Sequence, residues 1–451
     1  MPANWLEYSL VDLCSEITVG HVGSMTNEYR DSGIPFFRSK NIREYRIDWD
    51  DVKYISQSFH EKLKKSTLRP GDVAVVRTGK PGTACVIPDC IDEANCSDLV
   101  IMRVNPKRLS AYFLSYYLNS VANHQINSQL VGAVQQHFNV GAAKKLSITI
   151  PDRNEQERIV KVVKDLDDKI QLNHQINQTL EQIAQAIFKS WFVDFEPVKA
   201  KIAVLEAGGS DEDALLAAMQ AISGKGEAEL ARLQTEQPEQ YAELRATAEL
   251  FPSAMQDSEL GEIPEGWEPA PLSELFELHR GFDLPQKSRE DGPYEVYAAG
   301  GLHGTHSQYK MEPPGIITGR SGVIGNVYLS LKKYWPLNTT LYVRQFRSCG
   351  PYYAYHLLKT LDLKSLNSGS AVPSLNRNFV HSIAVLNPGS KVLNKFESLS
   401  SSLFEQVVQN IDQNELLSTL RDTLLPKLLS GELSVSTAED QLAEAAEPAN
   451  V

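Results

Sequence analysis

Cationic and amide side chains gather in short polar runs that could contact a nucleic acid. Arg38-Ser39-Lys40-Asn41 combines residue types that bind phosphate oxygens with types that hydrogen-bond to base edges. Arg77-Thr78-Gly79-Lys80 sets two cations beside a glycine, which lets the backbone approach a phosphate closely. Gln135-Gln136-His137 supplies amides suited to adenine or guanine edges. These runs predict binding chemistry.

A matching set lies in the second half of the chain. Thr318-Gly319-Arg320-Ser321-Gly322 answers Thr78-Gly79-Lys80-Pro81-Gly82 at an offset of 240. The predicted contact residues of this half are Arg280, Lys287, Lys310, Arg320, Ser321, Ser374, Asn376 and Arg377. Each run alone is more typical of a solvated loop, and the neighbouring aromatic residues are more typical of a core. The repetition of the runs is what favours binding.

The sequence lacks the motifs of an enzyme with its own active site. It contains no GxxxxGK[ST] phosphate loop, GxSxG elbow or HExxH zinc site. The nearest match to an amino-methyltransferase signature, Glu312-Pro313-Pro314-Gly315, lacks both the Asp or Asn and the aromatic residue. The five cysteines form no CxxC pair, so Cys85, Cys90 and Cys96 are better interpreted as reduced thiols than as metal ligands. We expect no catalytic residue, metal or cofactor.

Two long apolar stripes are the elements that would position the polar runs. From Ile159 to Trp191, apolar residues recur mostly every three or four positions, which predicts one face of a long helix. Adding 237 to each position gives a second stripe without a gap, and two asparagines of the first stripe fall on asparagines of the second. A polar residue in an apolar seam costs stability but fixes register, so the repeat predicts two helices that align with each other.

The predicted seam residues come from both stripes. They are Ile159, Leu166, Ile170, Asn173, Asn177, Leu180, Leu403, Val407, Asn410, Asn414 and Leu417, and the first stripe continues through Ile183 and Ile187. The alternative is two unrelated core helices of a globular domain.

The rest of the chain divides into two mixed α/β blocks. Short β-like runs of the first block are Ile34–Arg38, Val73–Arg77, Ala84–Ile87, Leu99–Val104 and Leu146–Ile150, with a helix over Ser110–Asn119. The predicted order is a domain at 1–150, a long helix at 151–195, a helical insert or linker at 196–262, a domain at 263–388, a long helix at 389–430 and a disordered acidic tail at 431–451. This is an α+β tandem pseudo-repeat.

Composition limits the class of protein. The 451 residues allow two or three domains, and no apolar run approaches the roughly 20 residues that cross a bilayer. The net charge of −13 opposes nucleic-acid binding at first sight, but the insert holds 14 acidic and five basic residues, which leaves both blocks mildly basic. The first eight residues carry no signal pattern, so we expect a cytoplasmic protein.

Phrases at the ends of the two stripes resemble one protein family. They are Asn154-Glu155-Gln156-Glu157-Arg158-Ile159, Ile187-Phe188-Lys189-Ser190-Trp191-Phe192-Val193-Asp194-Phe195-Glu196-Pro197-Val198, Gly261-Glu262-Ile263-Pro264-Glu265-Gly266-Trp267 and Leu424-Leu425-Pro426-Lys427-Leu428-Leu429-Ser430-Gly431-Glu432. With the tandem order, nearly the whole chain resembles the specificity (S) subunit of a type I restriction–modification system. The second helix departs from the pattern, since it begins Lys391-Val392-Leu393-Asn394.

The resemblance implies a division of tasks between subunits. Each block would be a target-recognition domain that reads one half of a split site in double-stranded DNA. The helices would pack antiparallel as a coiled coil, and the roughly 50 Å spanned by residues 159–191 would separate the halves by on the order of 14 base pairs. Two modification subunits with S-adenosylmethionine would methylate adenine, and restriction subunits would use ATP and Mg. A stand-alone DNA methyltransferase or endonuclease, or a repeat scaffold for protein partners, are the alternatives.

Overall fold

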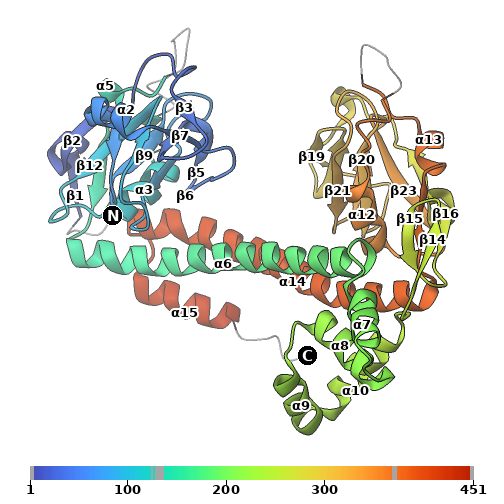
Figure 1. The fold of residues 1–451 in the computed structure, drawn as a ribbon. Helices are drawn as coiled ribbons and strands as arrows, with labels where there is room; N and C mark the ends of the chain where they lie inside the picture. Colours follow the sequence, from blue (N-terminus) through green and yellow to red (C-terminus); the bar gives the residue numbers. More distant parts are fainter. Residues whose placement is uncertain (1–4, 123–124, 127–136, 368–372, 447–451) are drawn as a thin grey trace. The chain divides into compact units, whose positions relative to one another are not determined.

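The chain divides into two units in a computed structural model that describes residues 5–122, 125–126, 137–367 and 373–446 (Figure 1). Unit 1 comprises residues 1–174 and 411–451, and unit 2 comprises residues 175–410. Each unit contains one α/β domain and a stretch of two long helices, which confirms the predicted α+β tandem. Among the described helices, none has both the length and the apolar character that crossing a membrane requires.

Two larger sheets form the domain of unit 1, with the strand orders β10-β9-β12-β2 and β3-β7-β4-β11-β8, and two-stranded sheets β1-β13 and β5-β6 accompany them. Strand β9 shows why the sequence folds this way, because alternate residues of Val73–Val76 enter two different apolar clusters, one on each face. The elements are β1 (Leu6–Ser9), α1 (Leu10–Leu13), β2 (Cys14–Val19), β3 (Tyr29–Arg30), β4 (Ile34–Phe37), η1 (Ser39–Asn41), β5 (Ile42–Arg43), β6 (Arg46–Ile47), β7 (Lys53–Ile55), α2 (Gln57–Lys62), η2 (Lys64–Ser66), β8 (Thr67–Leu68), β9 (Val73–Val76), β10 (Ala84–Val86), β11 (Ala94–Cys96), β12 (Leu99–Val104), α3 (Ala111–Asn119), α5 (Val140–Lys144) and β13 (Ser147–Ile150).

The strongest sequence patterns of this domain are confirmed. Strands β4, β9, β10, β12 and β13 and helix α3 begin and end within one residue of the predicted bounds. Strands β3, β7, β8 and β11 were not predicted, because two or three residues carry no readable period.

The domain of unit 2 repeats this plan. Its sheet β17-β23-β20-β21 has the same order as β2-β12-β9-β10, and a second sheet has the order β19-β18-β22. The elements are β16 (Glu268–Pro271), α11 (Leu272–Leu275), β17 (Phe276–Arg280), η3 (Gln286–Ser288), β18 (Tyr294–Ala298), β19 (Gly301–His306), β20 (Gly315–Gly319), β21 (Val327–Ser330), β22 (Tyr334–Pro336), β23 (Thr340–Phe346), α12 (Pro351–Thr360), α13 (Arg377–His381) and β24 (Ala384–Asn387).

The two long helices, α6 (Arg153–Phe192) and α14 (Ser390–Ser430), run side by side in opposite directions within each unit (Figure 1). In unit 1, Asn173 Nδ2 donates to Asn414 Oδ1 at 2.8 Å. In unit 2, Asn410 Nδ2 donates to Asn177 Oδ1 at 2.7 Å. Each asparagine of α6 therefore pairs with the repeat counterpart of the other, as an antiparallel pair of equivalent helices requires.

Burial along the helices follows most of the predicted stripe. The buried members are Ile159, Leu166, Asn173, Asn177, Val407, Asn410 and Asn414, and the half-buried ones are Ile170, Leu180, Leu403 and Leu417. The prediction is wrong at Ile183, which is 41% exposed, whereas Ala184 is fully buried. The seam continues at Ala184, seven residues beyond Asn177. The more hydrophobic Ile183 was predicted in its place because hydrophobicity was the only criterion.

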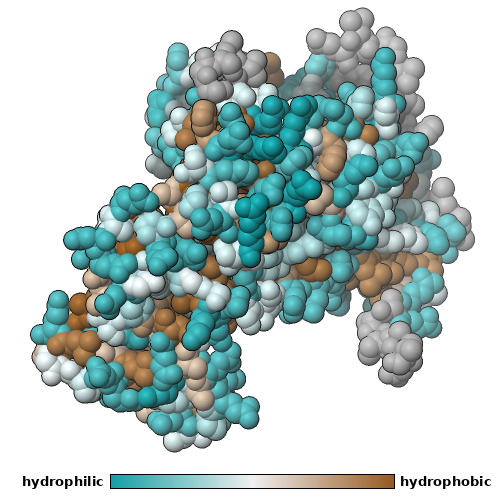
Figure 2. Space-filling model, turned by 90° about the vertical axis from the view of Figure 1, so that its right-hand side faces the viewer, coloured by the Kyte–Doolittle hydropathy of each residue, from teal (hydrophilic) through white to brown (hydrophobic). Residues whose placement is uncertain are grey.

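The insert forms a packed helical module of unit 2 rather than a bare linker. A small apolar core around Leu215, Met219 and Leu230 holds it together. Figure 2 shows apolar side chains that reach the surface of the module among polar ones. Its elements are α7 (Glu196–Glu206), α8 (Asp211–Ser223), α9 (Glu227–Glu236) and α10 (Pro238–Glu249), followed by the hairpin β14 (Met255–Ser258) and β15 (Gly261–Pro264).

The tail is not disordered as predicted, because it forms helix α15 (Val435–Ala446). Val435 is 2% exposed and joins the apolar cluster of the unit 1 domain. At the offset of 237, Val435 and Leu442 correspond to Val198 and Leu205 of α7, so each long helix is followed by an equivalent short one. The small, acidic composition of the tail concealed this apolar stripe.

Candidate nucleic-acid interface

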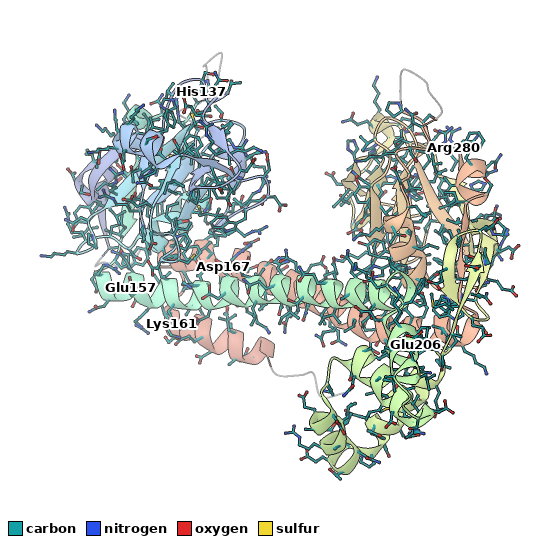
Figure 3. All side chains as sticks on the ribbon, in the orientation of Figure 1. His137, Glu157, Lys161, Asp167, Glu206 and Arg280 are labelled. Atoms are coloured by element: carbon teal, nitrogen blue, oxygen red, sulfur yellow. The ribbon has the colours of Figure 1, made fainter. Side chains whose placement is uncertain are left out.

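A glycine turn follows strand β9 in unit 1. Gly79 and Gly82 have φ of 89° and 93°, a left-handed conformation that side chains disfavour, so the turn depends on glycine. The backbone N–H of Phe138 donates to the carbonyl of Arg77 at 3.0 Å. This bond ties the turn to the segment that contains the predicted contact residue His137 (Figure 3).

The same turn follows strand β20 in unit 2. Gly322 and Gly325 have φ of 90° and 92°, and the backbone N–H of Leu375 donates to the carbonyl of Arg320 at 2.8 Å. The two turns therefore share their glycine positions, their arginine and the backbone bond that anchors the arginine.

This equivalence corrects the predicted alignment of the two halves. Val76 and Gly319 each end their strand, which makes Arg77 the counterpart of Arg320 at an offset of 243. The predicted match of Lys80 with Arg320 at an offset of 240 is wrong. The loops that precede the two strands differ in length, so one offset cannot serve a whole domain. Each turn reads Arg-(Thr or Ser)-Gly.

A groove of about 610 Å³ opens beside the turn of unit 1. Arg43 and Arg46 enter it from the β5–β6 hairpin, whose Arg-Glu-Tyr-Arg tip is a signal that sequence reasoning missed. Arg421 enters from α14, and nothing in its sequence neighbourhood indicated this position. The groove joins these cations to predicted contact residues from two loops, namely Lys40, Thr78 and Lys80.

Acidic partners hold several predicted cations of unit 1. Asp51 forms ion pairs with Arg38, Lys40 and Lys53. Hydrogen bonds from Lys40 and then Lys53 lower the pKa of the Asp51 carboxyl below its usual range. Because the Asp51 side chain is exposed, water screens these pairs, and phosphate groups can compete for the cations.

Asn41 shapes the loop and does not contact a ligand, so its place among the predicted contacts is wrong. It is fully buried, and its Nδ2 donates to the carbonyls of Asp48 and Asp50 at 3.1 and 3.2 Å. Its Oδ1 accepts a hydrogen bond from the backbone N–H of Arg38 at 3.1 Å. With both ends of the amide satisfied, Asn41 fixes the loop that presents Arg38 and Lys40.

In unit 2, four predicted residues meet at one edge of the β17-β23-β20-β21 sheet. Arg280 (Figure 3) pairs with Leu341 of β23, and Arg320 follows the strand on the other side of β23. A backbone bridge joins Ser321 to Ser374. The strand order of this sheet therefore brings residues from three separate segments together.

Other predicted residues of unit 2 are engaged elsewhere. Asn376 caps α13, because its side chain accepts a hydrogen bond from the backbone N–H of Asn378 at 2.9 Å. The Lys310 ammonium lies over the rings of Trp335 and Phe282, at 4.8 and 5.9 Å from their centroids. A nucleic acid would have to compete with both arrangements.

The remaining predicted contacts are less informative. Lys287 is exposed and Arg377 is half-buried, while Gln135 and Gln136 lie outside the described residues. Within the part of the chain that the structure describes, no group of three or more His, Cys, Asp or Glu side chains could hold a metal ion.

A half-buried polar network fixes the unit 1 domain to the long helices. Asp167 of α6 (Figure 3) pairs with Arg421 of α14 at 2.8 Å and accepts a hydrogen bond from the Tyr116 hydroxyl of α3 at 2.8 Å. Arg421 also lies over the ring of Tyr45, at 4.9 Å, in the tip of the β5–β6 hairpin. Burial raises the pKa of Asp167 although Arg421 and Tyr116 oppose the shift. The network links the groove wall to both helices.

Aromatic rings pack the unit 2 domain against the two long helices. The rings of Phe188 in α6 and Phe396 in α14 lie 5.8 Å apart, and Tyr353 of α12 lies 5.4 Å from Phe188. His356 stacks on Phe188 at 5.4 Å, and burial lowers the pKa of His356 to about 4. His356 is therefore uncharged near neutral pH and packs as one more ring of this cluster.

Residues 2–182 and 264–390 match the family model described as the type I restriction modification DNA specificity domain. The two matched segments include both glycine turns and both domains, and together they span more than half of the chain. The chain belongs to this family. It is a type I specificity subunit, and its membership favours DNA recognition over both alternative functions.

Two specificity subunits resemble this one along most of their length. The HindI specificity subunit of Haemophilus influenzae is 38% identical over 326 residues, which cover 65% of this chain and 70% of that protein. The MjaIX specificity subunit of Methanocaldococcus jannaschii is 24% identical over 473 aligned residues, covering 96% and 95%. In fold, the chain is similar to the crystal structure of the type I S subunit from M. genitalium, with a TM-score of 0.51 and 17% identity over 95% of this chain and 96% of that one.

Proposed function

We propose that this specificity subunit reads a two-part DNA target and catalyses no reaction itself. The observation that carries the proposal is the duplicated Arg-(Thr or Ser)-Gly turn, anchored by the same backbone bond in both domains. One reading turn in each domain suits a target with two halves. The helices α6 and α14 would set the distance between the halves, on the order of 14 base pairs.

Recognition would divide into positioning and reading. Exposed cations such as Lys80 and Arg43 contact phosphates, which gives affinity that depends on salt. Arg77 and Arg320, held by their backbone, read base edges in the major groove, where guanine is the preferred partner of arginine. Partner subunits supply S-adenosylmethionine, ATP and Mg, so methylation and cleavage occur on them, in the cytoplasm, and this chain needs no cofactor.

A second apolar stripe on α6 suits the docking of a modification subunit. In unit 2, Ile176 and Ile183 lie beside the predicted stripe residues Leu180 and Ile187. The four recur at gaps of four, three and four residues, and each is half-buried or exposed. A stripe of this spacing is the face that an amphipathic partner helix covers. We therefore assign it to the modification subunit, with a separate restriction subunit joining the assembled complex.

The reading role is tested with Arg77→Ala and Arg320→Ala in the complex with modification subunits. Each change should weaken binding to a target duplex roughly tenfold and relax the sequence requirement in one half-site only. Arg245→Ala is the matched control, because Arg245 also pairs with an acidic residue, Glu212, but lies in the helical module. Unchanged affinity and unchanged methylation sites in both variants would remove the turns from the interface.

The docking role is tested with Ile183→Glu, measured as affinity for the modification subunit in a titration without DNA. A charge on the exposed stripe should lower that affinity at least about tenfold, since its desolvation opposes helix contact. Gln182→Glu, also exposed and one residue away, should have little effect. Equal affinities of the two variants would place the docking face elsewhere.

A further inference from the structure

Asp98 occupies an unusual position in the unit 1 domain. It is the second of two residues that join β11, in one sheet, to β12, in the other. Its φ of 55° is left-handed, a conformation that Asp and Asn tolerate better than most residues with a side chain. The chain therefore accepts local strain to place a carboxylate at the boundary between the two sheets.

The strand neighbours of this junction bring two loops of the groove to Asp98. Strand β11 lies beside β4, whose end leads into Ser39. Strand β12 lies beside β9, where Leu99 faces Val76, and the next residue is Arg77. Because the two pairings meet at one point, the loops that follow β4 and β9 converge there.

The Asp98 carboxylate contacts side chains from both loops. The Ser39 hydroxyl donates to the Asp98 carbonyl at 3.1 Å and lies 3.4 Å from Oδ2. The Thr78 hydroxyl donates to Oδ2, and Arg77 Nη1 lies 3.3 Å from Oδ1. The carboxylate is 43% exposed, so its negative charge also faces the solvent beside the groove. A charge of that sign opposes phosphate binding, which makes a geometric role the better explanation of its presence.

In unit 2 a neutral residue occupies the position equivalent to Asp98. Thr340 faces Gly319 as Leu99 faces Val76, so Thr339 is the counterpart of Asp98. The Thr339 hydroxyl accepts a hydrogen bond from the backbone N–H of Ala299 at 3.3 Å.

The Thr339 carbonyl completes this second junction. It accepts hydrogen bonds from the backbone N–H groups of Arg320 and Ser321 at 2.8 and 3.1 Å. Both domains thus use the residue before the long central strand to join the reading turn to the loop of the neighbouring sheet.

We propose that Asp98 is a positioning residue for DNA reading, which holds Arg77 and Thr78 against the Ser39 loop so that they meet base edges in one geometry, and that Thr339 has this task in unit 2. The inference rests on the proposed reading role of the turns. Its consequence is that Asp98 contributes to the choice of sequence while working against general affinity for DNA.

The test is Asp98→Gly in the complex with modification subunits, because glycine keeps the left-handed backbone without strain. The target is first defined by sequencing methylated adenines in cells that carry the wild-type complex. Affinity for a target duplex should fall at least about tenfold, whereas affinity for an unrelated duplex should stay equal or rise. Asp98→Asn keeps a hydrogen-bond acceptor for Thr78 but loses the ion pair, so it should recover part of the discrimination.

Two outcomes overturn the proposal. If both duplexes bind Asp98→Gly more tightly by the same factor, Asp98 acts only as a charge. If neither affinity changes and the methylated sites stay the same, Asp98 has no part in recognition.

Lys80→Ala separates this failure from failure of the proposed interface. It removes an exposed cation of the same groove, so it should weaken both duplexes about equally and lower the salt dependence by about one counterion. If Lys80→Ala changes nothing while Asp98→Gly loses only the target duplex, the groove is not a phosphate site but the positioning role stands. If Lys80→Ala weakens both duplexes and Asp98→Gly is silent, the groove stands and the positioning role falls.

Discussion

The two domains of this specificity subunit are attached to the same pair of helices by different chemistry. In unit 1 the contact is polar, with Asp167 between Arg421 and Tyr116. In unit 2 the repeat counterpart of Asp167 is Phe404, whose ring stacks on Tyr352 at 4.4 Å and 4°. The two units therefore share the helix pair but differ in the contact that orients each domain on it.

The difference has an energetic meaning. A buried ion pair loses much of its attraction to desolvation, but its directional bonds allow few orientations. Stacked rings bury more apolar surface, and their packing adds to stability beyond that area. We therefore expect the polar contact to fix the angle of the unit 1 domain and the aromatic contact to supply most of the cohesion in unit 2. Arg421 belongs both to this contact and to the wall of the unit 1 groove. The contact that fixes the angle of the domain therefore also fixes the position of one cation of the groove.

The largest expected effect is truncation of a ring in the aromatic cluster of Phe188, Tyr353 and Phe396, which packs the unit 2 domain on the helices. Phe396 is fully buried against rings of α6 and α12, so Phe396→Ala should destabilise unit 2 by about 3–5 kcal/mol. Hydrogen exchange of the α12 amides, followed by mass spectrometry, measures the effect locally. The repeat counterpart Ile159→Ala should cost unit 1 less, about 2–4 kcal/mol. A smaller loss for Phe396→Ala than for Ile159→Ala would reverse the comparison.

Breaking the polar contact should come next. Asp167→Ala leaves the Tyr116 hydroxyl without its acceptor and the half-buried Arg421 with Asp422 as its acidic partner, at a cost of about 2–4 kcal/mol to unit 1. The double variant Asp167→Phe with Arg421→Ala installs the unit 2 residues at both positions and should recover more than half of that loss. Exchange of the α3 amides provides the measurement. If the stability losses of Asp167→Phe and Arg421→Ala, measured singly, add up to the loss of the double variant, the two residues do not act as a pair.

A pH-dependent difference should follow from the helix caps. In unit 2, Glu397 accepts the backbone N–H groups of Tyr353 and Tyr352 at 2.7 and 3.3 Å, and burial raises its pKa to about 7. In unit 1 the neutral Gln156 accepts the N–H of Ser110 at 2.9 Å. Because the folded state holds the Glu397 proton more tightly than the unfolded chain, unit 2 should lose stability as pH rises from about 4.5 to about 7 and then level off.

Glu397→Gln should remove this loss, because a neutral amide has no charge to bury. The variant should match the wild type near pH 4.5 and exceed it by about 3 kcal/mol at pH 8, measured by exchange in α12. Glu405→Gln, an exposed change on the same helix, is the control and should leave the pH profile unchanged. A wild-type profile that is flat across this window would contradict the assignment.

The smallest expected effect concerns the feature that both units share. Asn414→Ala and Asn177→Ala each remove one partner of a buried asparagine pair, so each should cost about 1 kcal/mol in its own unit. Equal losses, measured by exchange in the flanking turns of α6, would show that the seam is symmetric while the domain contacts are not. A loss in one unit only would extend the asymmetry to the helices.

The internal repeat of the sequence predicted the pair of long helices and the tandem order of the domains. Local apolar patterns predicted the longest strands and helix α3. Strand β12 and helix α3 carry continuous apolar patterns, and the asparagine repeat indicated the helix pair. The groove was only half predicted, because Arg421 reaches it from a distant helix and Asp98 depends on the meeting of two sheets. Ile183 was wrongly predicted to lie in the seam, because its large apolar side chain was preferred to Ala184, whose position fits the seam spacing. Helix α15 was not predicted because the tail is rich in small and acidic residues, which conceal the match of Val435 with Val198 in the repeat.

The discontinuity of unit 1 has a consequence for synthesis. Its apolar cluster joins Leu10 and Phe113 to Leu428 and Val435, which are separated by the whole of unit 2. At 5–20 residues per second, a ribosome needs roughly 15–60 s to travel from residue 150 to residue 438. During that time the first domain to emerge has an open apolar face, while unit 2, which is continuous, can complete its fold. A nascent chain that stops before α15 would therefore expose apolar surface in its N-terminal domain, where chaperones and proteases can recognise it.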